Sequence, residues 1–292
     1  MNKRILIITG DNIGLGFNQI EFPDIEYLQF PIIIDEQEFR ESETYNSNWL
    51  IEKYKKENIV ARTTSIVKGD LVEIVEKNRD KYDLIVHIVM SSVMSAATFT
   101  IAEDVRKMYK EIIPIINIDT KQVVGGVGVI LLRIIDIIKE NRDTDEIISL
   151  SKEIINTTFS FLVIPDLKYL YKGGRIGKTK AMMGSVLKII PLVGLFGDDN
   201  EGLILPVGKG RTFKQVNSLL ISTISDKLKD YSIDKAKLIN ILSMNDNPEA
   251  VSDLIEKLED SVPCEKVIIG EPHLVGSVYL GPKSYSLAIN FK

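Results

Sequence analysis

Apolar runs alternate with amphipathic segments along the first half of the chain. The runs at residues 4–9, 84–89 and 112–118 are short and rich in Ile and Val, and turn or cap residues bound them, which predicts buried strands. Apolar residues at helical spacing predict helices over residues 49–57, 70–77, 93–109, 126–139 and 145–155. This alternation of strands and helices favours a parallel sheet with right-handed crossovers.

The pattern restarts near residue 159, where a new strand is predicted to begin. A glycine-rich segment follows at residues 171–184, and then strands at 191–196 and 203–206 flank a turn at 197–202, as in a hairpin. Later elements are expected as helices over 212–229 and 248–258 and strands over 237–242, 267–270 and 286–291. We therefore predict an α/β fold of two lobes, with an N-terminal domain at residues 1–157 and a C-terminal domain at residues 158–292.

The composition excludes several classes of function. The chain has 292 residues and a net charge of -5, so it lacks the basic field needed to coat nucleic acid or an anionic membrane. A single cysteine, Cys264, rules out an intrachain disulfide and a cysteine-based zinc cluster, and two histidines leave little for histidine-based chemistry. No targeting segment or uninterrupted run of about 20 apolar residues stands out. We expect a cytoplasmic protein without a membrane span, a metal or a cofactor.

Three glycine- or acid-rich segments suggest phosphate or cation sites without matching the required spacing. Residues 172–179 end like a P-loop, but Lys172 replaces its first glycine and the preceding segment reads as a helical turn. Residues 10–16 follow a strand without the dinucleotide-binding spacing. The acidic turn at 198–201 lacks the EF-hand pattern. Ordinary turns are the favoured interpretation of all three.

Hydroxyl side chains gather where two predicted strands lead into helices. One cluster is Thr63-Thr64-Ser65, and the other is Ser91-Ser92 with Ser95 one turn further on. Ligands of parallel α/β sheets bind at the carboxyl ends of strands, where helix N-termini offer free N–H groups. This arrangement suits an anionic head such as a carboxylate. The same residues could equally be helix caps, and their positions alone leave both interpretations open.

Taken in order, these clusters and the glycine-rich segments resemble the DegV family of bacterial fatty acid-binding proteins. The likeness spans nearly the whole chain, and its most specific part is Tyr-Leu-x-x-Gly-Gly-Arg-Ile at residues 169–176. The other matching motifs are Thr64-Ser65, the double serine of residues 91–96, Asp119-Thr120 with Gly125, Gly126 and Gly128, then Gly184, Leu187, Lys188, Pro191, Lys209, Arg211 and Gly281-Pro282.

The resemblance implies two lobes with a long-chain fatty acid between them, its tail buried and its carboxylate held by hydroxyl groups. It also implies a partner, the catalytic subunit of a fatty acid kinase, which phosphorylates the presented carboxylate. Carried over by motif, the carboxylate-binding residues are Thr64, Ser65, Ser92 and Tyr279. The supporting loops contain Ser91, Ser95, Gly126 and Arg175, and Arg211 is the expected contact for the kinase. No nucleic acid is expected, and a transient contact with a membrane stays open.

The chain departs from the family pattern at three places. The opening Asp-Ser-Thr reads Gly10-Asp11-Asn12, and Ala96 replaces a glycine after the serine motif. Tyr279 stands where the family often has a histidine, and a phenol donates a hydrogen bond but cannot become cationic. Two alternatives to a carrier therefore stay open: an enzyme acting on a phosphorylated or acyl small molecule, and a ligand-free regulatory paralogue.

Overall fold

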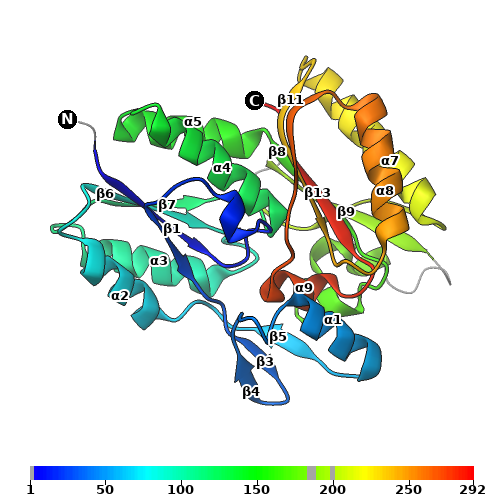
Figure 1. The fold of residues 1–292 in the computed structure, drawn as a ribbon, viewed down its shortest axis with the longest axis horizontal. Coiled ribbons are helices and arrows are strands. Elements are labelled where there is room, and N and C mark those ends of the chain that lie inside the picture. The colour runs from blue at the N-terminus through cyan, green and yellow to red at the C-terminus, as the bar shows by residue number, and fades with distance from the viewer. Residues whose placement is uncertain (1–2, 183–188, 198–200) are drawn as a thin grey trace.

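A four-stranded parallel sheet forms the core of the N-terminal half of the molecule (Figure 1). The computed structural model describes residues 3–182, 189–197 and 201–292. The sheet order is β2-β1-β6-β7, from strands β1 (Ile5–Gly10), β2 (Ile25–Leu28), β6 (Leu84–Val89) and β7 (Ile115–Asp119). All neighbours pair in parallel, so the predicted parallel sheet is confirmed.

A six-stranded mixed sheet forms the core of the second half, in the order β10-β9-β8-β13-β11-β12. Its strands are β8 (Thr158–Val163), β9 (Ile190–Phe196), β10 (Leu205–Gly210), β11 (Ala236–Ser243), β12 (Cys264–Ile269) and β13 (Tyr285–Asn290). β9 and β10 pair antiparallel, which confirms the predicted hairpin. Residues 198–200 of its turn, and with them most of the acidic turn considered above, lie outside the described residues.

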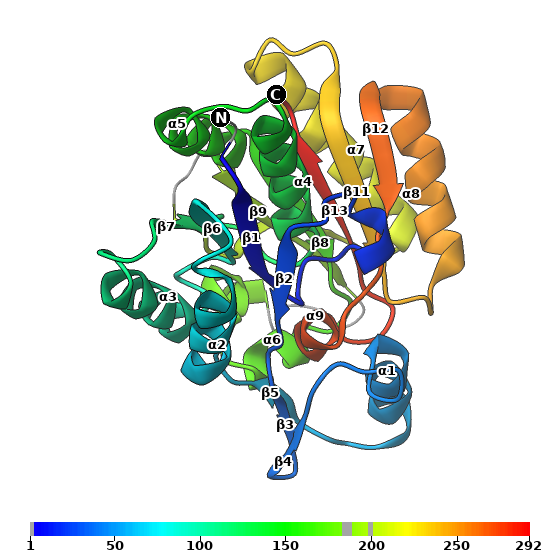
Figure 2. The same ribbon diagram turned by 60° about the vertical axis from the view of Figure 1, so that its left-hand side comes forward.

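A small antiparallel sheet, β4-β3-β5, projects from the N-terminal half beside helix α1 (Ser47–Lys56) (Figure 2). Its strands are β3 (Ile32–Ile34), β4 (Gln37–Phe39) and β5 (Ala61–Thr63). Asp35 and Glu36 join the first two with φ of 48° and 67°, as a tight hairpin turn requires. The sequence prediction missed this sheet and β2, because runs of three or four residues carry too little periodicity to register.

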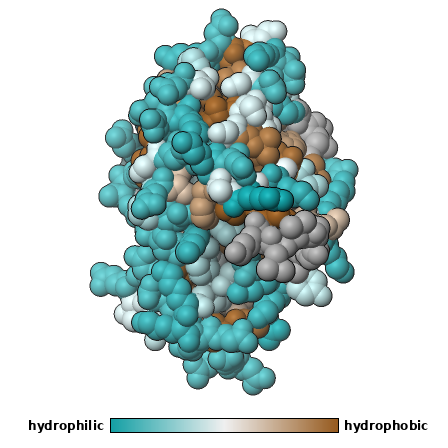
Figure 3. Space-filling model, turned by 90° about the vertical axis from the view of Figure 1, so that its right-hand side faces the viewer, coloured by the Kyte–Doolittle hydropathy of each residue, from teal (hydrophilic) through white to brown (hydrophobic). Residues whose placement is uncertain are grey.

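Most helices lie within two residues of the predicted positions. Helices α2 (Lys68–Asn78) and α3 (Ala96–Met108) pack against one another beside the four-stranded sheet, and α7 (Phe213–Asp230) and α8 (Pro248–Ser261) do so beside the six-stranded sheet. The side of the molecule shown in Figure 3 is mostly hydrophilic with small hydrophobic areas between polar side chains. Each of these four helices buries apolar residues on one face, among them Leu71 and Val75 of α2 and Leu254 and Leu258 of α8, which accounts for the amphipathic pattern.

Helix α4 (Gly125–Lys139) lies between the two large sheets. It contacts β6 of the first sheet and β8, β11 and β13 of the second, and α5 (Thr144–Asn156) packs beside it. Eleven of the fourteen residues from Gly125 to Ile138 are buried, and Leu132, Arg133 and Asp136 are the exceptions, as expected of a helix that is covered on most sides. The strands divide between the sheets at residues 157/158, where we place the domain boundary, but α4 belongs to the packing of both halves. The division into two domains stays a prediction.

The last helix, α9 (Leu274–Leu280), returns from the C-terminal half to the N-terminal half. It contacts α1 and β5, and also the short helix α6 (Lys168–Lys172) (Figure 2). Ser277 donates a hydrogen bond to Ser47 (2.6 Å), and the Tyr54 hydroxyl donates to the carbonyl oxygen of Val278 (3.2 Å). The sequence prediction missed α9, whose seven residues are almost all buried and therefore lack an amphipathic pattern.

The close approach of α4 to the loop after β1 gives a test of this packing. A Cβ at Gly128 would overlap the carbonyl oxygen of Ile13 and lie 2.8 Å from Leu15 Cγ. We expect Gly128→Ala to lower the free energy of unfolding by about 1–3 kcal/mol, as overpacking does. Gly69→Ala is the control, because nothing lies within 4 Å of its added Cβ and alanine favours the helix. Urea unfolding measures both, and equal stability of the two variants would contradict the packing.

Candidate ligand-binding site

An apolar cavity lies between the two halves of the molecule. Its wall comes from the loops after β1 and β6, from α6 and α9, and from residues of the six-stranded sheet. The apolar lining residues are Phe30, Met90, Met94, Val123, Val124, Leu162, Leu170, Ile204, Val275, Gly276 and Leu280. Polar side chains enter the wall at Asn12, Thr63, Ser95, Arg175 and Tyr279. The wall thus combines a large hydrophobic area with a few polar groups, as small-molecule sites do.

The volume of the cavity is about 50 Å³. Pockets that hold drug-sized ligands typically measure about 300–1,000 Å³. A long acyl chain would therefore enter only if lining side chains moved. The methionines Met90 and Met94 are the most adaptable of these side chains, since methionine is unbranched and has three rotatable bonds.

The hydroxyl groups of Thr63 and Tyr279 meet at the cavity wall, with 2.5 Å between their oxygens. Thr63 is the last residue of β5, and Tyr279 lies in the last turn of α9. Gly281 ends α9 with φ of 69°, and a side chain there would overlap the ring of Tyr169. The Gly281-Pro282 pair therefore terminates the helix directly after the cavity-lining residues.

Arg175 lies beside the Tyr279 ring, with its guanidinium carbon 5.5 Å from the ring centroid. It also donates hydrogen bonds to the carbonyl oxygens of Gly173 (2.8 Å) and Met94 (3.3 Å). A Cβ at Gly173 would lie 2.5 Å from the Tyr279 ring, and Gly174 has φ of 72°. The Gly-Gly-Arg motif thus places a cation against the ring of Tyr279.

This geometry also accounts for the resemblance of residues 172–179 to a P-loop. The glycines follow helix α6, and in the described part of the chain β8 ends at Val163, well before them. A P-loop requires a strand to lead directly into the glycine-rich turn. The favoured interpretation of this segment as a glycine-rich turn agrees with the structure.

The serine loop after β6 has a different role for each hydroxyl group. Ser91 is buried and donates to the carbonyl oxygen of Gly202 (2.6 Å). Ser92 donates to a carboxylate oxygen of Asp119 (2.5 Å), and its N–H donates to the other (3.0 Å). Ser95 lines the cavity and donates to Thr98 (2.9 Å). Of the three serines, only Ser95 lines the cavity.

The structure brings only part of the predicted carboxylate site together. Tyr279 lines the cavity, whereas Thr64, Ser65 and Ser92 do not, and Thr64 is exposed. The neighbouring Thr63 lines the cavity instead of Thr64. Alternation along β5 could have found it, because Thr63 shares a face with the buried Ala61 while Arg62 points outward.

The other predicted residues serve the packing or lie elsewhere. Gly126 lies in the first turn of α4, where a Cβ would overlap Ser160 and meet Gln122, so close packing of α4 on the second sheet requires a glycine. Arg175 lines the cavity as well as bracing its loop. Arg211 is exposed just before α7 and does not line the cavity. Gly184, Leu187 and Lys188 lie outside the described residues.

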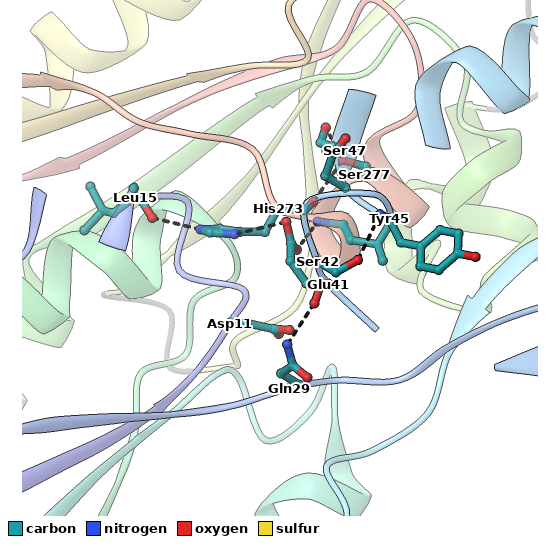
Figure 4. Close-up of polar contacts among 12 residues, drawn as sticks. Asp11, Leu15, Gln29, Glu41, Ser42, Tyr45, Ser47, His273 and Ser277 are labelled. Carbon is teal, nitrogen blue, oxygen red and sulfur yellow. Dashed lines mark hydrogen bonds and ion pairs between the residues drawn. The ribbon is translucent and has the colours of Figure 1, made fainter. Parts of the chain in front are cut away.

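A buried ionisable cluster holds the N-terminus of α9 (Figure 4). The Glu41 carboxylate accepts from the N–H of Leu274 (2.6 Å) and lies 3.6 Å from Nδ1 of His273. His273 Nε2 faces the carbonyl oxygen of Leu15 (2.8 Å). Asp11 is buried close by and accepts from the N–H of Phe30, a residue of the cavity wall. The cluster thus fixes α9 relative to the end of β1.

The environment of this cluster shifts two pKa values. Burial raises the pKa of Asp11 to about 7, and the charge of Glu41 adds to the rise. Burial disfavours the charged form of His273, but the hydrogen bond and charge of Glu41 outweigh it, so the pKa of His273 is raised. Asp11 therefore changes its charge near neutral pH inside the protein. No sequence pattern predicts this cluster, because its members come from distant parts of the chain.

The described residues contain neither a membrane-spanning helix nor a cluster of metal-ligating side chains. Within residues 3–182, 189–197 and 201–292, no helix is long and apolar enough to cross a membrane. The same residues contain no group of three or more His, Cys, Asp or Glu side chains placed to hold a metal ion. The features that define the site are its apolar wall and the few polar groups in it.

The fold and the cavity define a two-lobed α/β protein with an apolar site between its halves. The chain belongs to the DegV family, because the model of that family, described as an uncharacterised protein, matches residues 4–292. Protein DegV of Bacillus subtilis is 26% identical over 260 residues, which cover 89% of each chain. This confirms the resemblance found in the sequence.

Solved structures share the fold over the whole chain. A DegV family protein of Thermus thermophilus, described for its fatty acid binding, superposes with a TM-score of 0.88 at 19% identity and covers 99% of this chain and 100% of that one. The fatty acid kinase B3 protein of Streptococcus pneumoniae, loaded with linoleic acid, superposes with a TM-score of 0.81 at 16% identity over 99% and 100%. The predicted two-lobed α/β fold is thereby confirmed.

The raised pKa of Asp11 predicts a pH-dependent stability. Between about pH 4 and pH 7 the folded chain holds a proton on Asp11 that the unfolded chain has lost, so the free energy of unfolding falls as the pH rises through this range. The raised pKa of His273 changes the free energy of unfolding in the same direction, because the stabilising effect of the protonated ring is lost as the pH rises. We expect Asp11→Asn to stabilise the protein at about pH 8 by up to about 4 kcal/mol and to flatten this dependence.

Urea unfolding at a series of pH values measures this effect. The exposed Asp80→Asn provides the matched control and should keep the slope of the parent protein. An Asp11→Asn variant with the same pH slope as the parent would show that another group titrates in this range.

Proposed function

We propose that this chain binds a long-chain fatty acid, with the tail in the cavity and the carboxylate at Thr63 and Tyr279. The observation that carries the proposal is the pair of hydroxyl groups that meet on a mostly apolar wall. The fatty acid binding described for the Thermus thermophilus protein and the linoleic acid in the Streptococcus pneumoniae protein support it, since both share this fold.

A carboxylate needs donors when it leaves water, and the Thr63–Tyr279 pair can supply two. Without a ligand the two hydroxyls satisfy one another. With a ligand, each can turn its proton toward a carboxylate oxygen. Arg175 adds a positive charge beside the Tyr279 ring. In this proposal the phenol of Tyr279 and the guanidinium of Arg175 together replace the histidine that the family often has at this position.

Ser92 has a supporting role in this proposal. Its N–H and hydroxyl both donate to Asp119, which leaves no proton for a ligand in this arrangement. The bonds fix the loop that carries Ser95, whose hydroxyl is at the cavity wall. Ser95 is therefore the serine of this loop that we assign to the neighbourhood of the carboxylate.

The tail dominates the binding energy. Each buried methylene is worth about 0.8 kcal/mol of gross transfer free energy, whereas a hydrogen bond to a charged group contributes about 1.5–3 kcal/mol. Enlarging a cavity of about 50 Å³ and ordering the chain reduce the gain. An acyl chain of ordinary length still leaves a surplus, so the site can open around its ligand.

The finer part of the proposal is that the bound acid is presented to a separate fatty acid kinase. The name of the Streptococcus pneumoniae relative supports this role. In it, this chain is a carrier, and phosphoryl transfer to the carboxylate belongs to the partner. Arg211, exposed beside α7, is the predicted contact. A cytoplasmic location and a transient contact with a membrane remain expectations from the sequence.

A second candidate is a regulatory protein that binds no acid. The small cavity and the mutual bond of Thr63 and Tyr279 favour it, because they describe a closed site. The two candidates differ in one measurable property, the uptake of a fatty acid.

The carrier proposal predicts about one fatty acid per chain in protein purified from cells. Native mass spectrometry of the full chain, followed by organic extraction, identifies and counts the bound molecule. Protein that is repeatedly free of lipid and takes up no added acid would favour the closed regulatory protein.

The carboxylate site predicts a second result. Tyr279→Phe keeps the ring that contacts Arg175 and removes the hydroxyl, so we expect affinity for palmitate to fall about 10- to 100-fold. Affinity for methyl palmitate, which carries no charge, should change much less. Calorimetric titration measures both, and Tyr45→Phe, on a partly exposed ring outside the cavity, is the control. Equal losses for acid and ester would remove Tyr279 from the carboxylate site.

A further inference from the structure

Met90 lies at the point where hydrophobic clusters of the two halves of the molecule meet. It follows β6 directly and packs against three hydrophobic clusters: the one around α4, the one between the first sheet and α2, and the one on the cavity side of the second sheet. Its side chain is only partly buried. A flexible side chain at such a junction can change its position without unpacking any one cluster.

A second, smaller void of about 10 Å³ lies behind the cavity, inside the N-terminal half. Gly10, Leu28, Ile66, His87 and Thr98 are among its lining residues. Three further residues, Asn12, Phe30 and Met90, line both this void and the main cavity. These three side chains are therefore the wall between the two spaces.

Of the three wall residues, Met90 has the side chain that can most easily change its conformation. Phe30 is a rigid ring whose backbone N–H is tied to Asp11. Asn12 is almost fully buried, and its amide donates to the sulfur of Met90 at 3.1 Å. Sulfur is a weak acceptor, so this bond holds Met90 in place at little cost to release.

The space behind Met90 suits an apolar chain end. Burial lowers the pKa of His87 to about 4, so its ring is uncharged near neutral pH, and Nδ1 is held by the side-chain oxygen of Asn117 at 3.2 Å. Thr98 already accepts a hydrogen bond from Ser95. A methyl end arriving there would bury no charge.

We propose that the side chain of Met90 is a movable partition between the two voids, and that residue 90 sets the longest acyl chain this protein accepts. The inference rests on the proposed fatty acid binding and adds a residue that controls specificity. A short chain fills the main cavity and leaves Met90 bonded to Asn12. A longer chain displaces Met90 and continues into the space beside His87.

The test is a calorimetric titration of the delipidated full chain with laurate, myristate, palmitate and stearate. Met90→Ala removes the partition, so the affinity for stearate relative to myristate should rise about fourfold for each further methylene that is buried, the equivalent of about 0.8 kcal/mol. Met94→Ala is the matched control, because Met94 lines the main cavity and not the second void. Its effect should be the same factor for every acid.

Each outcome bears on a different statement. A Met90→Ala variant with the chain-length profile of Met94→Ala would overturn the partition and leave fatty acid binding intact. A parent protein that binds none of the acids would overturn both. If Met90→Ala does not fold, the ¹³C resonance of the Met90 methyl group in the parent protein decides. It should shift on adding stearate, with exposed Met108 as the unmoved reference, and an unchanged Met90 signal would overturn the partition.

Discussion

The packing of α4 between the two large sheets is the constraint on which the rest of the structure depends. A helix buried on both sides must offer apolar side chains all around and small residues where a backbone approaches closely. Its glycines at 126 and 128 meet that need against Ser160 and the loop after β1. Because α4 fixes one sheet against the other, the ends of β1 and β6 come to face the second sheet across the cavity.

Helix α9, from the C-terminal half of the chain, packs against the N-terminal half and completes the cavity wall. The N-terminus of α9 is bound by Glu41 and His273, and its end is set by Gly281 against Tyr169. Charges buried this deeply are stable only when paired, which ties the geometry of α9 to the protonation of Asp11 and His273. The position of Tyr279 is thus a consequence of contacts at both ends of its helix.

The long elements could be predicted from the sequence because their apolar residues repeat over many positions, as in β6 and α4. The missed elements, β2 to β5 and α9, are short or buried on all sides, so tertiary contacts rather than periodicity define them. The candidate site divides in the same way. The order of motifs located Tyr279 and the Gly-Gly-Arg turn. Choosing Thr63 over Thr64 requires knowing which face of β5 each side chain is on. The positions of Asp11 and Met90 depend on contacts between distant segments, which no local pattern predicts.

The site therefore combines a rigid part with an adaptable part. Tyr279 lies on helix α9, which is held at both ends, Thr63 lies on a paired strand, and the Tyr279 ring packs closely against Gly173. The cavity wall also contains Met90 and Met94, side chains that change shape at low cost. A site with one rigid and one adaptable part suits a fatty acid. Its carboxylate requires hydrogen-bond donors at fixed positions, whereas the hydrophobic binding of its tail is non-directional. In the proposed function the small volume of the cavity follows from this adaptable wall, because methionine side chains can fill the space that an acyl tail takes when it binds.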